Sequence, residues 1–409
     1  MPYISVIPTV AAINKEAATY AQNLTYRAFG ALKGLTYGNN NTLALSYNNR
    51  LQLTNWTVPN VLGWEYSYND YYNADDGRVL FAKNTASSTA AGLRDDKLDR
   101  SYDYDQVGRL NVSHTGYEAR LHMNRQGAGD STNYGAYSQA YNYDQWGNMT
   151  SRVGWGGWDG AGVNYTLAYS NNRQSINPIN NAAMQYDASG NQTNNGYWSF
   201  QYDATGQMTA ATDGGNVLSH NYDGDGLRFK KVENGTTTYY LRSSPLGGQV
   251  VAEFNGSGTW TRGYVYLGSQ MIAIQQGTNN TVSWVHQDPV TKSQRTTASN
   301  GTVTSTIDLD PWGGETSVSA NQSFQPHCFT SYERDVNNHD QAQARSYQRQ
   351  SSSVGKNQCR PEARPPSCLT SVVICNKKCV FLQRRVLRLS TLAASSSINS
   401  EVFELSDGM

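Results

Sequence analysis

The sequence predicts an all-β protein built as an array of β-hairpins, and three observations lead to that prediction. The first is composition: of 409 residues only 16% are charged, while 37 Gly and 28 Tyr far outnumber 9 Phe and 7 Met. Tyr and Thr suit the half-buried surface of a sheet, and Gly and Asn suit the positive φ angles of tight turns. The second is a repeated turn motif. The third is a set of short runs in which aromatic and polar residues alternate, as in strands.

The turn motif is Tyr-Asp-x-x-Gly, and it occurs in five close copies. Asp at the first position of a type I turn accepts hydrogen bonds from the turn backbone, and the Gly three residues later takes the left-handed conformation of a bulge. Five copies with the same offsets predict an array in which each hairpin contacts mainly its neighbours. The motif residues are Tyr104, Asp105 and Gly108; Tyr143, Asp144 and Gly147; Tyr186, Asp187 and Gly190; Tyr202, Asp203 and Gly206; and Tyr222, Asp223 and Gly226.

The spacing of the motif divides the chain into four segments. Residues 1–36 are less regular, and a helical turn is expected at residues 15–22, which are rich in Ala. Residues 37–221 form the repeat array, with a weaker copy of the motif at Tyr169, and the spacing changes in residues 222–350. Residues 351–409 lose the turn residues and gain Arg, Ser and Cys, so an irregular C-terminal tail is predicted.

The repeat resembles the YD repeat of RHS proteins, Tc-toxin C subunits and teneurins. From Tyr222 onward the chain is similar, element by element, to the RHS repeat-associated core domain, and the whole resemblance covers roughly residues 24–348. The matching elements begin at Tyr222 (YDGDGLRFKKVENGTTTYYL), His286 (HQDPVTKSQRTTASNGTV), Ile307 (IDLDPWGGE), Phe329 (FTSYERD) and Ala344 (ARSY). The residues that match the most specific core-domain motifs are Asp310, Pro311 and Gly313, and Glu333, Arg334 and Asp335.

The resemblance implies a fold and a role. Family members coil the sheet of hairpins into a hollow shell, which the core domain closes around a variable C-terminal polypeptide. The implied partners are therefore such a cargo and the remaining, N-terminal part of a longer shell. The implied location is secreted or at the cell surface, although no signal peptide is recognisable in this chain.

No catalytic site, metal site or cofactor is expected, and the chain is not expected to be an enzyme. The six His residues fall in no metal-binding spacing, and phosphate-binding loops are absent from the sequence. Self-cleaving relatives carry two Asp-Pro segments after the Glu-Arg-Asp element, which this sequence lacks, and Asp310-Pro311 is expected to form a turn. A formal net charge of zero and the absence of a long apolar run argue against nucleic-acid binding and membrane insertion.

Two other functions remain open. One is a cell-surface carbohydrate-binding or adhesion repeat, in which Trp146, Trp155, Trp158 or Trp198 would stack on sugars; packing within the sheet is the favoured role for these residues. The other is a carrier of a small C-terminal toxin domain within residues 351–409. That tail is either a genuine cargo or an out-of-frame translation. The frameshift is favoured, since residues 368–388 follow neither a strand nor a helix period.

Overall fold

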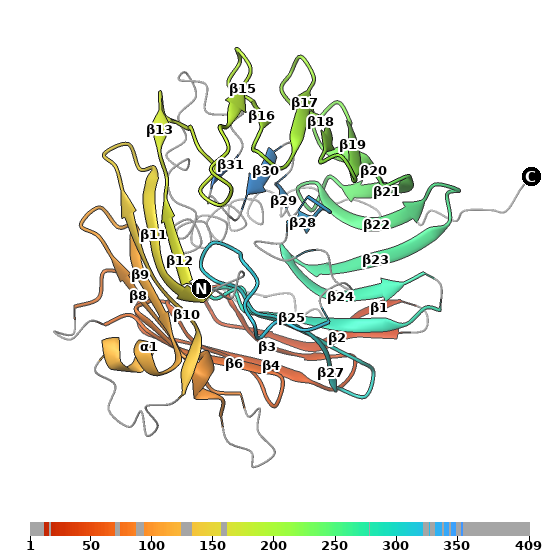
Figure 1. Cartoon of the computed structure of the whole chain (residues 1–409). Helices are drawn as coiled ribbons and strands as arrows, with labels where there is room; N and C mark the ends of the chain where they lie inside the picture. The colour runs from red at the N-terminus through yellow and green to blue at the C-terminus, as the bar shows by residue number, and fades with distance from the viewer. Residues whose placement is uncertain are drawn as a thin grey trace, which may run out of the picture.

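The computed structural model is almost wholly β, which confirms the predicted fold class (Figure 1). Two large antiparallel sheets, one of 12 strands and one of 13, make up most of the described chain. The described residues are 12–15, 18–69, 74–86, 94–123, 133–156, 162–277, 279–321, 327, 332–337, 339–342, 345–348 and 353–354.

The first sheet is a meander in which strand order equals chain order. Its strands are β1 (Ala12–Lys15), β2 (Ala18–Tyr26), β3 (Leu32–Tyr37), β4 (Thr42–Tyr47), β5 (Leu53–Val58), β6 (Leu62–Ser67), β7 (Phe81–Asn84), β8 (Arg100–Tyr104), β9 (Leu110–Thr115), β10 (Tyr134–Tyr143), β11 (Met149–Gly156) and β12 (Gly162–Thr166). A 3-10 turn, η1 (Asp96–Leu98), and a short helix, α1 (Gly116–His122), interrupt it.

A separate hairpin, β13 (Tyr169–Ser170) and β14 (Arg173–Gln174), leads to the second sheet, which is also a meander. Its strands are β15 (Gln185–Tyr186), β16 (Gln192–Asn194), β17 (Ser199–Tyr202), β18 (Met208–Thr212), β19 (Val217–Tyr222), β20 (Arg228–Glu233), β21 (Thr236–Ser243), β22 (Gln249–Asn255), β23 (Trp260–Leu267), β24 (Gln270–Gln276), β25 (Val282–Gln287), β26 (Gln294–Thr297) and β27 (Val303–Ile307).

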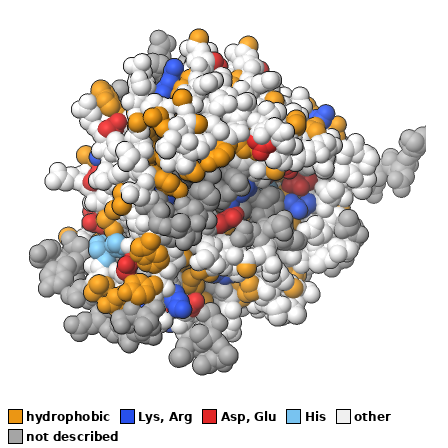
Figure 2. Space-filling view, in the orientation of Figure 1, with side chains coloured by type: hydrophobic (Ala, Val, Ile, Leu, Met, Phe, Trp, Pro, Cys, Tyr) orange, Lys and Arg blue, Asp and Glu red, His pale blue; other side chains and the backbone are white. Residues whose placement is uncertain are grey.

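The last strands form a small sheet of four: β28 (Glu333–Arg334), β29 (His339–Ala342), β30 (Arg345–Gln348) and β31 (Ser353–Val354). In Figure 1 the two large sheets curl around a central space, and β28–β31 lie within it. Figure 2 shows few charged side chains on this face, in keeping with the low content of charged residues.

One hydrophobic core joins the two large sheets. Trp56 and Trp64 of the first sheet and Ile272 and Trp284 of the second are buried in the same cluster. The indole N–H of Trp284 donates to the backbone carbonyl of Tyr20 (3.0 Å), which links β25 to β2. The last strands of the second sheet therefore pack against the first sheet, although some 260 residues separate these partners in the chain.

One local expectation from the sequence is contradicted by the fold. The helical turn predicted at residues 15–22 is wrong: β1 ends at Lys15, and β2, which begins at Ala18, pairs with strands on both sides. The ladder of backbone hydrogen bonds overrides the helix propensity of this Ala-rich stretch. The second sheet also runs without interruption through residue 222, where the repeat spacing changes. Within the described residues no helix is long and apolar enough to cross a membrane.

Candidate functional site

All five motif copies form the same turn. In the first, the Asp105 carboxylate accepts hydrogen bonds from the backbone N–H groups of Val107 (3.1 Å) and Arg109 (2.8 Å), and the N–H of Gly108 donates to the Asp105 carbonyl (2.8 Å). In each copy the register of the hairpin shifts by one residue at the motif Tyr, as in a bulge. The motif glycines have the positive φ that the sequence predicts: 86° at Gly108, 84° at Gly147, 90° at Gly190, 80° at Gly206 and 76° at Gly226.

The motif tyrosines have a role that the sequence did not reveal. Each hydroxyl donates a hydrogen bond to a backbone carbonyl of the preceding hairpin, so successive hairpins are tied together. The pairs are Tyr104 to Val79 (3.0 Å), Tyr143 to Leu110 (2.6 Å), Tyr186 to Gln174 (2.7 Å), Tyr202 to Gln192 (2.8 Å) and Tyr222 to Met208 (2.8 Å). In every copy the Tyr directly precedes the Asp, and this fixed position is the sequence feature from which the contact could have been predicted.

In two turns, the Arg that follows the turn glycine (Gly108 or Gly77) covers the next turn. The Arg109 guanidinium lies 4.8 Å from the centre of the Tyr143 ring and donates to the backbone carbonyl of Asp144 (2.9 Å). Arg78 lies over the Tyr104 ring in the same way (5.3 Å). At these positions neighbouring turns are therefore in direct contact, as expected for a repeat array.

Replacing Gly226 with Ala is expected to destabilise the protein by about 1–3 kcal/mol, because φ at this residue is +76° and an added Cβ would lie 3.0 Å from Nε2 of Gln207. Gly224 in the same turn is the matched control: it lacks a positive φ, and a Cβ there would meet nothing within 4 Å. Gly224→Ala should leave stability unchanged or raise it slightly. Urea unfolding of both variants measures the difference, and equal effects would contradict the turn assignment.

Two residues of the Glu-Arg-Asp element lie in a buried charged cluster against the wall of the second sheet. The Arg228 guanidinium of β20 bonds Glu333 Oε2 (2.6 Å) and Asp335 Oδ2 (2.7 Å). The Lys231 ammonium bonds Glu333 Oε1 (3.0 Å) and Asp335 Oδ1 (3.2 Å). The Tyr240 hydroxyl of β21 also donates to Glu333 Oε1 (2.6 Å). This group of five side chains, together with His220, is called the wall cluster below.

The charges of the wall cluster are matched within it. Burial by itself would raise the pKa of Glu333, but the positive charges of Lys231 and Arg228 outweigh burial and hold that pKa well below its usual range. The pKa of Asp335 is lowered in the same way, with Arg228 as the largest lowering influence. Burial and the neighbouring Arg228 together lower the pKa of His220, so the imidazole is neutral at pH 7. Both carboxylates are therefore charged and fully engaged.

Arg334, the middle residue of the element, points elsewhere. Its guanidinium pairs with Asp340 (2.8 Å) and with Glu315, and it donates to the backbone carbonyl of Gly313 (3.1 Å). It therefore connects the Glu-Arg-Asp element to the Asp-Pro-Trp-Gly-Gly-Glu element. The sequence identified these two elements separately, and the structure brings them into contact.

Asp310 starts a turn with the same bonding as the repeat turns. Its Oδ1 accepts from the N–H groups of Trp312 and Gly314 (both 2.9 Å), and φ of Gly313 is 84°. Its Oδ2 binds the Arg152 guanidinium of β11 (2.6 Å), and both side chains are fully buried. Asp310, Pro311 and Gly313 thus build a turn that is anchored to the first sheet, as the turn prediction for this Asp-Pro pair requires.

His286 and Asp288, which lie two residues apart, are both buried but bind different partners. His286 Nε2 lies 2.8 Å from Thr297 Oγ1, and its ring stands edge-on to Tyr37 (4.3 Å between centres). Asp288 accepts from the hydroxyls of Tyr66 and Thr291. Burial lowers the pKa of His286 to about 3. Within the described residues, no three His, Cys, Asp or Glu side chains are placed to hold a metal ion.

The structure separates the tryptophans that the sequence grouped together. Trp198 is buried and Trp155 packs edge-on against Tyr134, in keeping with sheet packing. Trp158 lies outside the described residues. Trp146, by contrast, is 67% exposed, so the packing role favoured for it is wrong.

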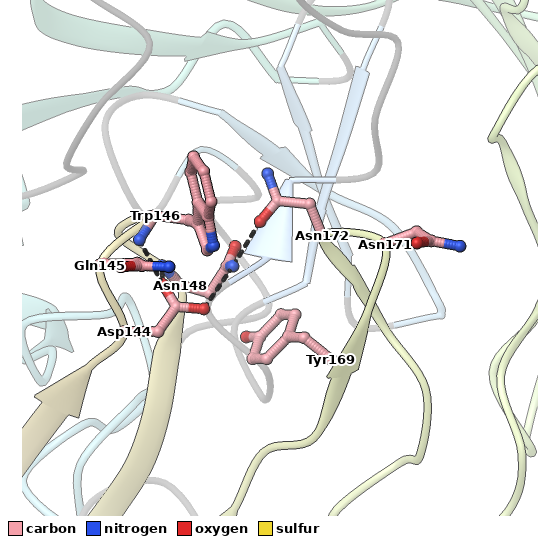
Figure 3. A pocket seen from close by; sticks show the side chains of 7 residues that line it. All are labelled: Asp144, Gln145, Trp146, Asn148, Tyr169, Asn171 and Asn172. Atoms are coloured by element: carbon pink, nitrogen blue, oxygen red, sulfur yellow. Dashed lines mark hydrogen bonds between the residues drawn. The ribbon is translucent and has the colours of Figure 1, made fainter.

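Trp146 lines an open pocket between the turn at residues 144–148 and the tip of the β13–β14 hairpin (Figure 3). The hairpin tip is a two-residue turn in which Asn171 and Asn172 have φ angles of 49° and 62°. The lining residues are Asp144, Gln145, Trp146, Asn148, Tyr169, Asn171 and Asn172. The weaker motif copy at Tyr169 thus forms one side of this pocket.

The chain is similar to large curated proteins over part of its length. It is 24% identical over 194 residues to the tRNA3(Ser)-specific nuclease WapA of Bacillus spizizenii and 24% identical over 196 residues to the tRNA nuclease WapA of Bacillus subtilis. Each alignment covers 46% of this chain and 8% of the relative, so the chain spans only a small part of those proteins. No family model matches the chain.

Solved structures resemble it over most of its length. A structure of TcdB2-TccC3-TEV superposes with a TM-score of 0.62 and 19% identity, and one of TcdB2-TccC3 with a TM-score of 0.61 and 18% identity. These matches cover 82% and 83% of this chain and 18% of each of those chains. At such identities the likeness establishes the fold: antiparallel sheets arranged as in the TccC3-containing structures.

Proposed function

We propose that this chain is a non-catalytic segment of an RHS-type shell that encloses or presents a variable C-terminal polypeptide. The observation that carries the proposal is the state of the motif carboxylates: Glu333, Asp335 and Asp310 are buried and paired with Arg or Lys. A general acid or base must reach a substrate and exchange a proton near neutral pH. These carboxylates instead hold the C-terminal elements against the sheets. That is a structural role, as expected of residues in a shell.

The fold supports the same proposal. A meander of 12 strands followed by one of 13, curled around a space that holds the C-terminal strands, suits a container wall (Figure 1). The relatives named as tRNA nucleases match over 8% of their length, and we assign that stretch to their shell, so nuclease activity is not proposed for this chain. Its partners would be a C-terminal cargo and further shell hairpins, in a secreted or cell-surface protein without a cofactor.

Incubation of the purified full chain at pH 7 tests the absence of catalysis. We expect one intact mass by mass spectrometry after several days and no degradation of a bulk tRNA substrate. Self-cleavage near Asp310 or Asp335, abolished by Asp310→Asn or by Asp335→Asn, would overturn the proposal. Cleavage of tRNA that persists through repurification would favour the alternative in which the chain carries a toxin domain.

A further inference from the structure

The exposed indole of Trp146 sits at a turn position where the other repeats place smaller or more polar side chains. The equivalent residues are Val107, Ser189, Thr205 and Asp225. Trp146 is 67% exposed. A large aromatic face left in water beside a pocket marks a site for a ligand with a matching apolar face.

We infer that this pocket binds an uncharged sugar. The C–H face of a pyranose ring stacks on an exposed indole, and the indole N–H remains free for a hydroxyl. Beside the indole, the side chains of Gln145, Asn148 and Asn172 supply amides, which both donate and accept hydrogen bonds (Figure 3). Amides suit sugar hydroxyls, which also donate and accept.

Part of the polar lining is already held in place. The Asn148 amide donates to Asp144 Oδ2 (2.8 Å) and to Asn172 Oδ1, so it joins the two turns that form the pocket (Figure 3). Asp144 Oδ1 in turn accepts the backbone N–H of Trp146 (2.8 Å). A site whose groups are fixed before binding loses less conformational entropy when the ligand arrives.

The charge of the lining restricts the ligand. Burial by itself would raise the pKa of Asp144, but the hydrogen bonds from Asn148 and from the turn backbone together outweigh burial and lower it, so the carboxylate is ionised. Among the described residues that line the pocket, Asp144 is the one that carries a charge. The nearby Arg109 is paired with Asp105 (2.6 Å). The local field therefore disfavours sulfated, phosphorylated and sialylated sugars.

Saturation-transfer NMR on the full chain tests the inference. The probes are glucose, galactose, mannose, N-acetylglucosamine and their β1,4-linked disaccharides, with sialyllactose and a heparin tetrasaccharide as charged probes. We expect at least one uncharged saccharide to bind with a millimolar Kd and the charged probes to give no signal. Trp146→Ala should weaken binding about tenfold or more, since it removes the stacking face.

Val107→Ala is the matched control, because Val107 occupies the same turn position and is 75% exposed. Neither substitution removes a buried side chain, so both variants should keep the wild-type unfolding midpoint. The inference is overturned if no uncharged saccharide responds at 10 mM, if Trp146→Ala binds as well as Val107→Ala, or if the charged probes bind best. The inference is also overturned if no saccharide responds and Trp146→Ala abolishes self-association of the chain, because the pocket would then be a protein-binding site.

Discussion

Replacing Arg228 with alanine is expected to lower the free energy of unfolding by about 3–5 kcal/mol, the largest effect of any single substitution discussed for this chain. The Arg228 side chain is fully buried and bonds both Glu333 and Asp335. Its removal leaves two buried carboxylates with Lys231 as their remaining strong cationic partner. Urea unfolding followed by tryptophan fluorescence measures the loss.

Two further variants make this prediction sharper. Arg50→Ala is the control, since the Arg50 side chain is 61% exposed and an exposed ion pair with Asp75 contributes little. Arg228→Lys keeps the charge but not the planar guanidinium that reaches both carboxylates. Its decrease in the free energy of unfolding should therefore lie between those of Arg50→Ala and Arg228→Ala. Limited proteolysis should cut Arg228→Ala, but not wild type, within residues 327–348 as the C-terminal strands leave the wall. If Arg228→Ala lowered the free energy of unfolding no more than Arg50→Ala, the wall cluster would not be holding the C-terminal strands against the second sheet.

The second large expected effect is a loss of folding stability in acid, which arises from buried histidines. The pKa of His286 falls from its usual 6.5 to about 3, and that of His327 to about 4, chiefly because burial penalises the charged ring. Below pH 6.5 the unfolded chain therefore takes up protons that the folded chain does not. Each of these histidines should reduce stability by about 2 kcal/mol between pH 7 and pH 5, at 1.36 kcal/mol per pKa unit.

Comparison of His286→Gln with wild type isolates this effect. Burial raises the pKa of Asp99, Glu253 and Asp288, whose protonation in acid favours the folded state, and these groups are common to both proteins. The stability of His286→Gln relative to wild type should therefore improve by about 2 kcal/mol from pH 7 to pH 5. A constant difference between His286→Gln and wild type across this pH range would show that His286 is not buried as a neutral ring.

The sequence alone determined the local chemistry of the hairpins. Asp105 and Gly108 lie within one turn, and the bonds they make span at most four residues. Such bonds depend on side-chain type and spacing, both of which can be read from the sequence. The all-β class, the meander of neighbouring hairpins and the turn at Asp310 followed from the same local rules.

Only the tertiary structure decided which of these residues meet across the fold. Glu333 and Arg228 stand 105 residues apart, and Asp310 and Arg152 stand 158 apart, so no local pattern linked them. Residue type alone is misleading in β20, where the charged Arg228 is buried while the neighbouring Phe229 is 40% exposed, which reverses the usual burial of apolar and charged residues. That reversal acquires a meaning only once the Glu-Arg-Asp element lies against the wall.

The same difference between local and long-range contacts explains the two predictions that are wrong, the helical turn at residues 15–22 and the packing of Trp146. Helix propensity at residues 15–22 yielded to β2, because pairing with strands on both sides provides more backbone hydrogen bonds than an isolated turn. Trp146 and Trp198 are the same residue type near similar turns, yet one is exposed and the other buried. Burial depends on which segments pack over a side chain, and in this protein those segments come from distant parts of the chain.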